Sequence, residues 1–523
     1  MGTVQPGARP GAGRLPGPGG VPPGRPLQRV LRCRAPARPP LLQLAGDPRD
    51  QVVNPCFGLF LLALSSSLAA CGGAPADPAT PAPASGGRSI VVITLDTTRA
   101  DFLGAYGGGL GVTPRLDALA EQGALFERAY APMPQTLPSH ATLFTGLMPR
   151  HHGALENTYV LEPGMLTLAE LAEARGYATG GFIGALAIEA ITGMDQGFST
   201  WSQPEGDWGQ DRLGHPPQRR ARDVTDAALA WAGGLDKQRP FLLWAHYYDP
   251  HGDGPQGFSP PRKHWKQVDP APVARLLASR RARFTGPYDV QQLTDFWVGY
   301  AAELLYTDEQ VGRLLDGLAD QGLMDDTLLL VVGDHGEGLW EHGVKAHGTH
   351  LWEEALRVPM ILVDPGGVGA GRRVQARVQL QDVLPTLRHG AFGEPGQQRE
   401  EVLGLDLWPL LQDGREPPPR PVVLERPHFG PGRIQHREGE LGFLTAVLLD
   451  ELKLVLRPDG TAALYDLSVD PDELTDLSAE RPAETVRMRD YLERWIERNR
   501  SAPPGRAEIS PERAQILKAL GYL

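Results

Sequence analysis

Cysteine is scarce in this chain of 523 residues, which has it only at positions 33, 56 and 71. Three cysteines cannot build the disulfide framework of a small secreted domain, and the first two precede any segment with the pattern of a folded domain. The composition, 41% hydrophobic and 22% charged, is that of an ordinary globular protein. It excludes a disordered, collagen-like or disulfide-built protein, and the length allows about three domains or one large α/β domain with an appendage.

Positive charge is also in short supply over most of the chain. The formal net charge is −12, although the first 50 residues hold eight arginines against two aspartates. The remainder therefore carries −18, and so acidic a body is a poor candidate for binding the phosphate backbone of a nucleic acid. We expect no nucleic-acid partner.

An apolar run before Cys71 predicts export. Residues 52–70 are uncharged, but their apolar core is shorter than the roughly 20 residues that a membrane-spanning helix needs. The sequence Leu-Ala-Ala-Cys at 68–71 resembles the lipobox of bacterial lipoproteins, in which the cysteine is lipidated and becomes the mature N-terminus. The alternatives are a signal peptide cleaved without lipidation and an N-terminal anchor helix. The lipoprotein interpretation places the protein in the bacterial cell envelope, anchored to the membrane through lipidated Cys71 and facing the periplasm or the exterior.

Residues 1–70 are expected to be a low-complexity prefix followed by the signal peptide, and residues 71–88 a linker rich in Ala, Pro, Gly and Ser. The Arg/Pro/Gly-rich first 50 residues are far longer than the charged start of a signal peptide, so we expect a true start codon further along the chain. The folded protein should begin near Ser89.

From Ser89 onward, apolar runs alternate with amphipathic stretches. The run 89–95 has the continuous β-branched pattern of a strand buried on both faces. Strands are also expected at 178–183, 241–246 and 327–332, and helices at 114–123, 166–174, 222–233 and 291–318. This alternation predicts a doubly wound α/β fold with a mainly parallel sheet, in which ligands bind at the carboxyl ends of the strands.

Acidic residues and histidines follow three of these strands. They are Asp96 after the first, His246, Asp249 and His251 after the middle one, and Asp334 and His335 after the last. Four histidines also fall within 16 residues, at positions 335, 342, 347 and 350. Because carboxylates and imidazoles that converge at one edge of a sheet can share a divalent ion, we predict a metal site there.

The segment 134–146, Pro-Gln-Thr-Leu-Pro-Ser-His-Ala-Thr-Leu-Phe-Thr-Gly, resembles the active-site signature of the sulfatase family in the alkaline phosphatase superfamily. That signature reads Cys/Ser-x-Pro-Ser-Arg, followed by a short helix and Thr-Gly. Other segments between about Ser89 and Trp495 resemble the family in order and spacing: Asp96 to Arg99, Thr113 to Ala120, Asp334 to Gly336, Glu353 to Pro359, Leu464 to Leu467 and Asp470 to Glu473.

The resemblance implies a large mainly parallel sheet of the alkaline phosphatase/sulfatase type, with a catalytic domain over residues 89–390. A smaller C-terminal subdomain would occupy residues 391–523. Strands expected at 420–425, 444–449 and 452–456, and a helix expected at 484–498, give it an antiparallel sheet and a helix. The Pro- and Arg-rich insert from His251 to Pro287 is interpreted either as a lid or as a surface excursion.

Two departures from the signature concern the nucleophile. In sulfatases the cysteine or serine becomes formylglycine, whose hydrated aldehyde attacks sulfur. Thr136 stands in that place, and its β-methyl group would limit oxidation to a ketone, while His140 replaces the arginine that completes the modification motif. In phosphodiesterase and phosphotransferase relatives a threonine forms a phosphothreonine. The resemblance therefore implies a hydrolase of phosphate esters, or else of sulfate esters, in which Thr136 attacks.

We also expect a helix beginning near Ser139 to offer its N-terminal N–H groups to a tetrahedral anion. Two alternatives to the hydrolase stay open: a phosphotransferase of the phosphoethanolamine-transferase type, and an inactive sulfatase-like lipoprotein that binds without catalysis. In each case the partner would be a small-molecule, glycan or lipid ester.

The resemblance implies Asp96, Thr136, Asp334 and His335 as ligands of a divalent metal. Calcium-type sulfatases have a second aspartate where Thr97 stands here, and an asparagine where His335 stands. Fewer carboxylates together with an imidazole favour zinc or manganese over calcium. We expect one or two such ions.

Three further histidines are assigned, with His140, to the catalytic residues: His251, His347 and His350. They would contact oxygens of the substrate and protonate the leaving group, or hold a second ion, with Asp249 or His246 beside His251. His342 belongs to no matched motif and is left out.

Overall fold

The computed structural model describes residues 87–204, 219–252, 257–284, 289–345, 347–395, 404–429 and 442–499. The chain divides into two units, Met1–Pro75 and Ala76–Leu523, and every described residue belongs to the second. The expected prefix, the signal peptide, Cys71 and most of the linker therefore lie outside the described residues.

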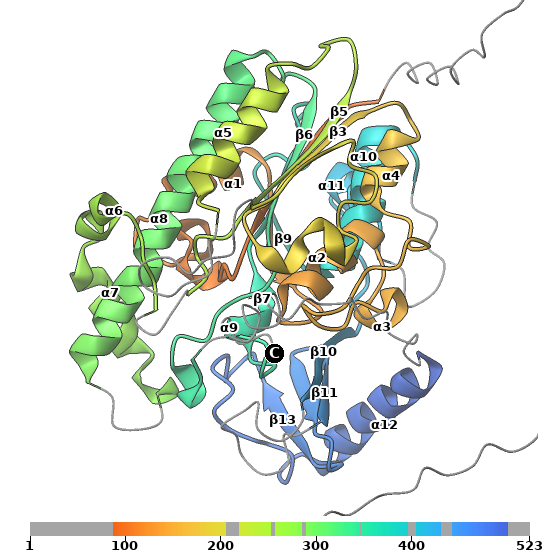
Figure 1. Ribbon diagram of the computed structural model, residues 1–523. Helices are drawn as coiled ribbons and strands as arrows, with labels where there is room; N and C mark the ends of the chain where they lie inside the picture. The colour runs from red at the N-terminus through yellow and green to blue at the C-terminus, as the bar shows by residue number, and fades with distance from the viewer. Residues whose placement is uncertain are drawn as a thin grey trace, which may run out of the picture. The chain divides into compact units, whose positions relative to one another are not determined.

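One large sheet dominates the described part of the chain (Figure 1). Its strands are β1 (Ser89–Leu95), β2 (Ala124–Tyr130), β3 (Ala178–Phe182), β4 (Thr200–Ser202), β5 (Phe241–Tyr247), β6 (Thr327–Gly333), β7 (Arg357–Val358), β8 (Met360–Val363) and β9 (Arg372–Gln379). They follow the order β4-β3-β5-β1-β6-β8-β2-β7, with β9 also paired to β2. The half from β4 to β6 is parallel, β8 runs antiparallel to both its neighbours, and β2 pairs parallel with β9. The predicted mainly parallel α/β sheet is confirmed.

Helices cover both faces of this sheet. They are α1 (Pro114–Gln122), α2 (Thr136–Thr145), α3 (Pro149–His152), α4 (Leu168–Glu173), α5 (Ala221–Ala232), α6 (Arg262–Gln267), α7 (Pro270–Ser279), α8 (Val290–Asp320), α9 (Glu353–Leu356), α10 (Val383–Phe392) and α11 (Trp408–Asp413). Ile90 and Val92 of β1 pack in the core that contains α2, α4 and α10, whereas Val91 and Ile93 pack with α1, α5 and α8 (Figure 1). Because side chains alternate along a strand, the uninterrupted apolar run of β1 serves both cores.

The insert after His251 packs as two helices, α6 and α7, against α8. Its residues Val273, Leu277 and Phe284 share a buried cluster with Leu293 and Trp297. The short 3-10 turn η5 (Arg281–Arg283) follows α7. Among the residues described, no helix combines the length and the apolar character needed to cross a bilayer.

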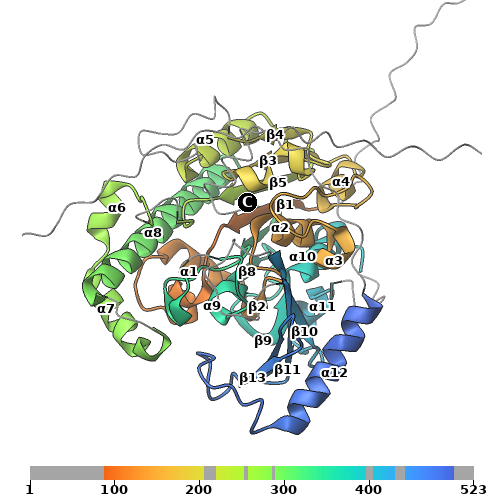
Figure 2. The same ribbon diagram turned by 60° about the horizontal axis from the view of Figure 1, so that its bottom comes forward.

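A second, antiparallel sheet follows, built from β10 (Val422–Phe429), β11 (Gly442–Leu449), β12 (Leu452–Leu456) and β13 (Ala462–Asp466). Helix α12 (Pro482–Arg498) lies across one face of it (Figure 2). Met488, Leu492 and Trp495 of α12 pack against Val447 and Leu454 of the sheet. The predicted antiparallel sheet and helix are confirmed, and the other face of this sheet packs on Leu351 and on Ala355 and Leu356 of α9.

A buried lysine joins this sheet to the large one. Lys453 of β12 is fully buried, and its Nζ lies 3.1 Å from Oε1 of Glu353 in α9 and 2.7 Å from Oε1 of Glu473. Burial acts to lower the pKa of Lys453, but the charges of Glu473 and Glu353 outweigh it, so the pKa is raised. Removing Lys453 would leave Glu353 and Glu473 without their counter-charge, which is costly for buried carboxylates.

Candidate active site

Thr136 is the first residue of α2, a helix whose ten residues are all buried. Its Oγ1 lies 3.4 Å from Nε2 of His335, which follows β6. The helix ends at Gly146, whose φ of 67° is in the left-handed region that glycine adopts without strain. The hydroxyl predicted to be the nucleophile is thus held beside a residue predicted to bind the metal.

The expected role of the helix N-terminus is wrong in detail. Helix α2 begins at Thr136 rather than near Ser139, and two N–H groups of its first turn are occupied. Leu137 N–H donates to Oδ1 of Asn157 at 2.8 Å, Pro138 has no N–H, and Ser139 N–H donates to the carbonyl of Gln135 at 3.2 Å. The N–H groups of these residues are therefore not offered to an anion.

Asp334 is oriented by two backbone N–H groups. Its Oδ1 accepts hydrogen bonds from Thr97 at 3.1 Å and from His335 at 2.7 Å. Its Oδ2 accepts none from the described residues and lies 3.5 Å from Nε2 of His335. Thr97 has a φ of 48°, and its carbonyl accepts a hydrogen bond from the hydroxyl of Tyr300 at 2.8 Å. Backbone contacts therefore fix one oxygen and leave the other facing the predicted metal site.

Asp96 completes a buried group with Asp334 and His335. One ligand atom from each of the three lies within 4.8 Å of the others. Within the described chain, neither carboxylate oxygen of Asp96 accepts a hydrogen bond; Oδ2 lies 3.4 Å from Nε2 of His246 and Oδ1 lies 3.8 Å from Nε2 of His335. All three side chains are fully buried. Two buried carboxylates with unsatisfied oxygens fit a cation, since unpaired buried charge is costly.

The pKa shifts agree with this fit. Burial raises the pKa of Asp334 well above its usual value, and the charge of Asp96 adds to the rise. Burial acts in the same direction on Asp96, but contact with His246 and the charges of nearby histidines outweigh it and lower that pKa. Burial lowers the pKa of His335 to about 3. A neutral imidazole beside two close carboxylates is the form that ligates a metal ion.

The tautomer of His335 also suits a ligand. Its Nδ1 lies 3.0 Å from the carbonyl oxygen of Gly336, which can only accept, so Nδ1 carries the proton. The lone pair on Nε2 then faces Thr136, Asp96 and Asp334. A histidine that ligates a metal characteristically donates its other N–H in this way.

His140 contacts the backbone of Thr136, the residue predicted to be the nucleophile. Its Nδ1 is 2.8 Å from the backbone carbonyl of Thr136 and its Nε2 is 3.0 Å from Oγ1 of Thr94. Burial lowers the pKa of His140 to about 3, so the ring is neutral and Nε2 accepts from the hydroxyl. Both ring nitrogens of His140 are therefore hydrogen-bonded to other groups of the protein.

A second grouping, His140, His246 and Asp334, also has ligand atoms close together. We favour the grouping of Asp96, Asp334 and His335 instead. Nδ1 of His140 donates to Thr136, and Nδ1 of His246 accepts the N–H of Gly184 at 3.4 Å, which leaves its proton on Nε2 towards Asp96. His246 then supports a carboxylate ligand.

Two of the remaining predicted histidines lie beside this group. The ring of His347 is 4.5 Å from that of His335 and 4.9 Å from that of His251, measured between centroids. Nδ1 of His347 is 3.3 Å from Oε1 of Glu337, and Nδ1 of His251 is 2.8 Å from the hydroxyl of Tyr248. His347 and His251 are thus brought together with the predicted metal ligands.

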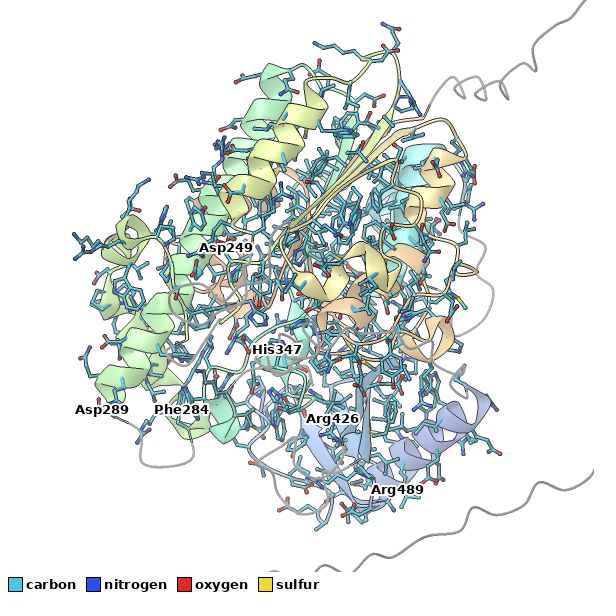
Figure 3. The ribbon with its side chains drawn as sticks, in the orientation of Figure 1. Asp249, Phe284, Asp289, His347, Arg426 and Arg489 are labelled. Atoms are coloured by element: carbon cyan, nitrogen blue, oxygen red, sulfur yellow. The ribbon has the colours of Figure 1, made fainter. Side chains whose placement is uncertain are left out.

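Asp249 and His350 are placed differently. The carboxylate of Asp249 caps α5, because Oδ2 accepts the N–H of Ala221 at 2.7 Å and Oδ1 accepts from Arg220 at 3.0 Å (Figure 3). Nδ1 of His350 accepts the N–H of Trp352 at 3.4 Å, and its ring lines a cavity of about 320 Å³ bordered by β11, β12 and β13. His342, which was left out, stacks on Trp352.

Sequence reasoning missed Asn157 and Glu337. Asn157 holds the N–H of the residue after Thr136, and Glu337 lies beside His347. Glu337 could have been found from its place two residues after His335 at a strand end. Asn157 stands in no motif, and only the folded chain reveals its contact.

A hydroxyl, two carboxylates and an imidazole buried at the carboxyl edge of a mainly parallel sheet define a metal-dependent α/β hydrolase. The family model described as Sulfatase matches residues 88–391, more than half of the chain. The chain belongs to the sulfatase family of the alkaline phosphatase superfamily, and it is a sulfatase-like hydrolase. Enzymes of this family use a divalent metal.

Two relatives illustrate the similarity. Arylsulfatase K of Xenopus laevis is 24% identical over 419 residues, covering 73% of this chain and 77% of that protein. Choline-sulfatase of Rhizobium meliloti (strain 1021) is 26% identical over 456 residues, covering 76% of this chain and 83% of that protein.

Two solved structures share the fold. The phosphonate monoester hydrolase of Agrobacterium radiobacter superposes with a TM-score of 0.61 and 21% identity, over 79% of this chain and 96% of that one. An enzyme solved with its substrate D-glucosamine-2-N,6-O-disulfate superposes with a TM-score of 0.63 and 21% identity, over 79% of this chain and 98% of that one.

Proposed function

We propose that this protein hydrolyses phosphate esters with Thr136 as the nucleophile. The observation that carries the proposal is the position of Thr136 Oγ1, 3.4 Å from His335 Nε2 and at the start of a fully buried helix. A threonine cannot become formylglycine, which removes the usual nucleophile for sulfate esters. The likeness to a phosphonate monoester hydrolase is consistent with attack at phosphorus.

Asp96, Asp334 and His335, with Thr136, would hold the ion, and the donor set of two carboxylates and one imidazole favours zinc or manganese over calcium. When bound, such an ion lowers the pKa of a coordinated hydroxyl and neutralises charge on oxygen. Backbone N–H groups keep Oδ2 of Asp334 turned towards the site, and His246 does the same for Asp96.

The reaction then proceeds in two balanced steps. In the first step the Thr136 hydroxyl loses its proton and Oγ1 bonds to phosphorus, while the phosphorus–oxygen bond to the alcohol breaks and the departing oxygen takes up a proton. In the second step the oxygen of a water molecule bonds to phosphorus, the Oγ1–phosphorus bond breaks, phosphate leaves, and a proton from the water returns to Oγ1 of Thr136. In this proposal His251 and His347 contact the substrate oxygens and supply the proton, and Glu337 orients His347; the closeness of His347 to His335 and His251 supports these roles. His140 fixes the backbone of Thr136, and a role for His350 remains a prediction.

The nucleophile is tested by substitution and by trapping. Thr136→Ala should lower the hydrolysis of an aryl phosphate by several orders of magnitude, since it removes the attacking oxygen. Thr136→Ser should keep part of the rate. Thr145→Ala, on the same helix but with its hydroxyl bonded to Ala141, is the matched control and should stay active.

Acid quenching during turnover should leave a phosphate on Thr136 that mass spectrometry can locate. Thr136→Cys alone should not produce a sulfatase, because His140 still interrupts the modification motif. Faster turnover of aryl sulfates than of aryl phosphates by the unchanged protein, with Thr136 unmodified, would contradict the proposal.

The phosphotransferase alternative differs only in the second step, where an acceptor alcohol replaces water. Product analysis in the presence of glycerol separates the two, because transfer yields a glycerol phosphate ester and hydrolysis yields free phosphate. The alternative of an inactive binding lipoprotein requires that no aryl ester be turned over. We further propose that the protein acts on small-molecule, glycan or lipid esters in the bacterial cell envelope, anchored through Cys71.

A further inference from the structure

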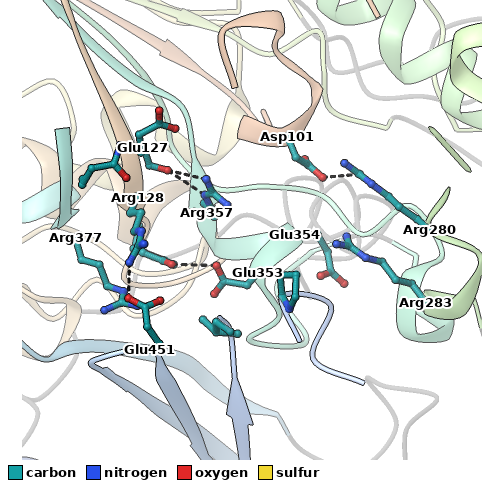
Figure 4. Close-up of a pocket in the computed structure, with 14 residues that line it drawn as sticks. Asp101, Glu127, Arg128, Arg280, Arg283, Glu353, Glu354, Arg357, Arg377 and Glu451 are labelled. Atoms are coloured by element: carbon teal, nitrogen blue, oxygen red, sulfur yellow. Dashed lines mark hydrogen bonds and ion pairs between the residues drawn. The ribbon is translucent and has the colours of Figure 1, made fainter. Parts of the chain in front are cut away.

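A second cavity, of about 450 Å³, lies apart from the predicted metal ligands, none of which is among its described lining residues (Figure 4). It is bordered by β2, β7 and β9 of the large sheet, by α9, by the turn η5, and by residues that follow β11 and β13. Five arginines line it in a chain whose net charge is −12: Arg128, Arg280, Arg283, Arg357 and Arg377.

Two of these arginines are direct neighbours across strands. Arg128 of β2 pairs in register with Arg377 of β9. Like charges in directly opposite positions destabilise a sheet unless something balances them. One carboxylate does so here: Glu451 accepts from Arg128 Nη1 at 2.7 Å and from Arg377 Nη2 at 3.0 Å (Figure 4).

Arg357 of β7 adds a third positive charge to the wall of the cavity that is formed by the strands β2, β7 and β9. It stands opposite Tyr130 of β2, and its Nε and Nη2 donate to the backbone carbonyl of Glu127 at 3.1 and 2.8 Å. Within the described ranges of the chain, no carboxylate pairs with Arg357, and the carboxylate of Glu127 is bonded to Arg373.

The wall therefore has a surplus of positive charge. The guanidinium groups of Arg128, Arg357 and Arg377 carry three positive charges. Among the described residues, the carboxylate of Glu451 is the one that pairs with them, through Arg128 and Arg377. Glu353 and Glu354 also line the cavity, but Glu353 pairs with Lys453, which Glu473 shares, and Oε1 of Glu354 lies 2.9 Å from Nδ1 of His342. The side chain of Arg377 is 10% exposed, and its Nε has no hydrogen-bond partner in the described chain. Buried guanidinium donors that lack partners are costly unless a ligand satisfies them.

The opposite wall is closer to neutral. Arg280 donates to Asp101 at 2.6 Å, and Arg283 pairs with Asp472. Both arginines come from the end of the insert that packs on α8 (Figure 4). The uncompensated charge of the cavity is thus concentrated on the three strands of the large sheet.

We propose that this cavity binds a sulfate or phosphate group, held by Arg128, Arg357 and Arg377. Planar guanidinium groups donate paired hydrogen bonds that match the oxygens of a tetrahedral anion. An anion would offset the positive charge of these three arginines, which only Glu451 pairs with among the described residues. The volume exceeds that of one such group, so the cavity also admits part of a larger molecule that carries it. This site does not depend on the proposed reaction at Thr136.

Calorimetric titration of the full chain with sodium sulfate at low ionic strength tests the site. Arg357→Gln is the most informative variant, because it leaves the bridge from Arg128 through Glu451 to Arg377 in place. We expect it to weaken sulfate binding by about tenfold or more, since a charged hydrogen-bonding fork is lost. Arg357→Lys keeps the positive charge but not the paired donors of a guanidinium group, so its affinity for sulfate should lie between that of Arg357→Gln and that of the unchanged protein.

Arg313→Gln is the matched control. Arg313 lies on α8 and pairs with Asp226 at the surface, so the same change of charge there should leave sulfate binding unaltered. The Arg357 variants should hydrolyse an aryl phosphate at the rate of the unchanged protein, and thermal unfolding verifies that they fold. Arg377→Gln provides a second variant with the same expected loss.

Absence of saturable sulfate binding in the unchanged protein would overturn the proposal and leave the arginines as a clamp for Glu451. Sulfate binding that neither Arg357→Gln nor Arg377→Gln weakens would also overturn it, because the anion would then bind elsewhere. A sulfated disaccharide titrated in parallel distinguishes the sources of the group. Tighter binding than inorganic sulfate supports a group carried on a larger molecule, and equal binding supports a free anion.

Discussion

The hydroxyl oxygen of Thr136 and Nε2 of His335 lie 3.4 Å apart although 199 positions separate the two residues in the chain. The contact exists because the buried helix α2 begins where the strand β6 ends. Both atoms carry lone pairs that face the buried carboxylates of Asp96 and Asp334. A cation among them would therefore be bound by the hydroxyl, the imidazole and the two carboxylates at once.

Replacing His335 tests that arrangement. His335→Ala should lose most of the zinc or manganese that we expect in the purified protein, measured by inductively coupled plasma mass spectrometry. His342→Ala is the control, because His342 lies in the same segment but bonds to Glu354. Stoichiometric calcium without a transition metal would show that the ligand assignment is wrong.

Asn157 should matter for stability and for rate. Asn157→Ala leaves the N–H of Leu137 without its acceptor, and a buried unsatisfied N–H costs about 1–3 kcal/mol. We expect a lower melting temperature and a lower kcat, because the first turn that carries Thr136 loosens. Asn157→Asp keeps an acceptor oxygen and should recover most of the stability. An unchanged melting temperature in the alanine variant would refute the assigned role.

Asp308 should make stability depend on pH. It caps α1 by accepting from the N–H groups of Arg115 and Leu116, and burial raises its pKa to about 6. The folded protein then holds this proton more tightly than the unfolded chain, so the contribution of Asp308 to stability falls as the pH rises from about 4 to about 6. The change is on the order of 3 kcal/mol.

Asp308→Asn should flatten that part of the pH dependence, measured by urea unfolding at pH 4, 5, 6 and 7. Asp316→Asn, at an exposed position of α8, the helix that also contains Asp308, is the control and should keep the original slope of stability against pH. If Asp308→Asn and the unchanged protein lose stability in parallel over this range, the raised pKa of Asp308 is not the cause.

Membrane attachment depends on Cys71 if the N-terminus is that of a lipoprotein. Cys71→Ser should release the protein from the membrane fraction into the soluble fraction, measured by ultracentrifugation and immunoblotting. Cys56→Ser, within the expected signal peptide, should leave the distribution unchanged. Continued sedimentation of Cys71→Ser with membranes would instead indicate an uncleaved anchor helix.

The strands buried on both faces were the most predictable parts of the fold. The continuous apolar runs of β1 and β6 leave no alternative to a central position in the sheet. By contrast, β2 contains Glu127 and Arg128, and β9 contains three arginines, so neither has the apolar pattern of a buried strand. Arg128 and Arg377 contact Glu451, and Arg373 contacts Glu127, all pairs far apart in the chain that the local sequence does not reveal.

The site was predictable where it follows from sheet geometry. Asp96, Asp334 and His335 each come directly after a central parallel strand, and the carboxyl ends of such strands meet. Side chains on the loops were not predictable in the same way. His347 reaches His335 whereas His350 lines another cavity, and the left-handed backbone of Gly348, with φ of 81°, lies between them.

The buried contact of Lys453 with Glu353 and Glu473 has a consequence for how the sequence can drift. A neutral replacement of Lys453 alone leaves two carboxylates without their buried counter-charge, which is costly, whereas a replacement of one glutamate alone leaves Lys453 paired with the other. Among homologues, therefore, a neutral residue at position 453 should occur together with loss of the carboxylates at positions 353 and 473. The small antiparallel sheet is bound in this way to evolve in step with the catalytic part of the chain.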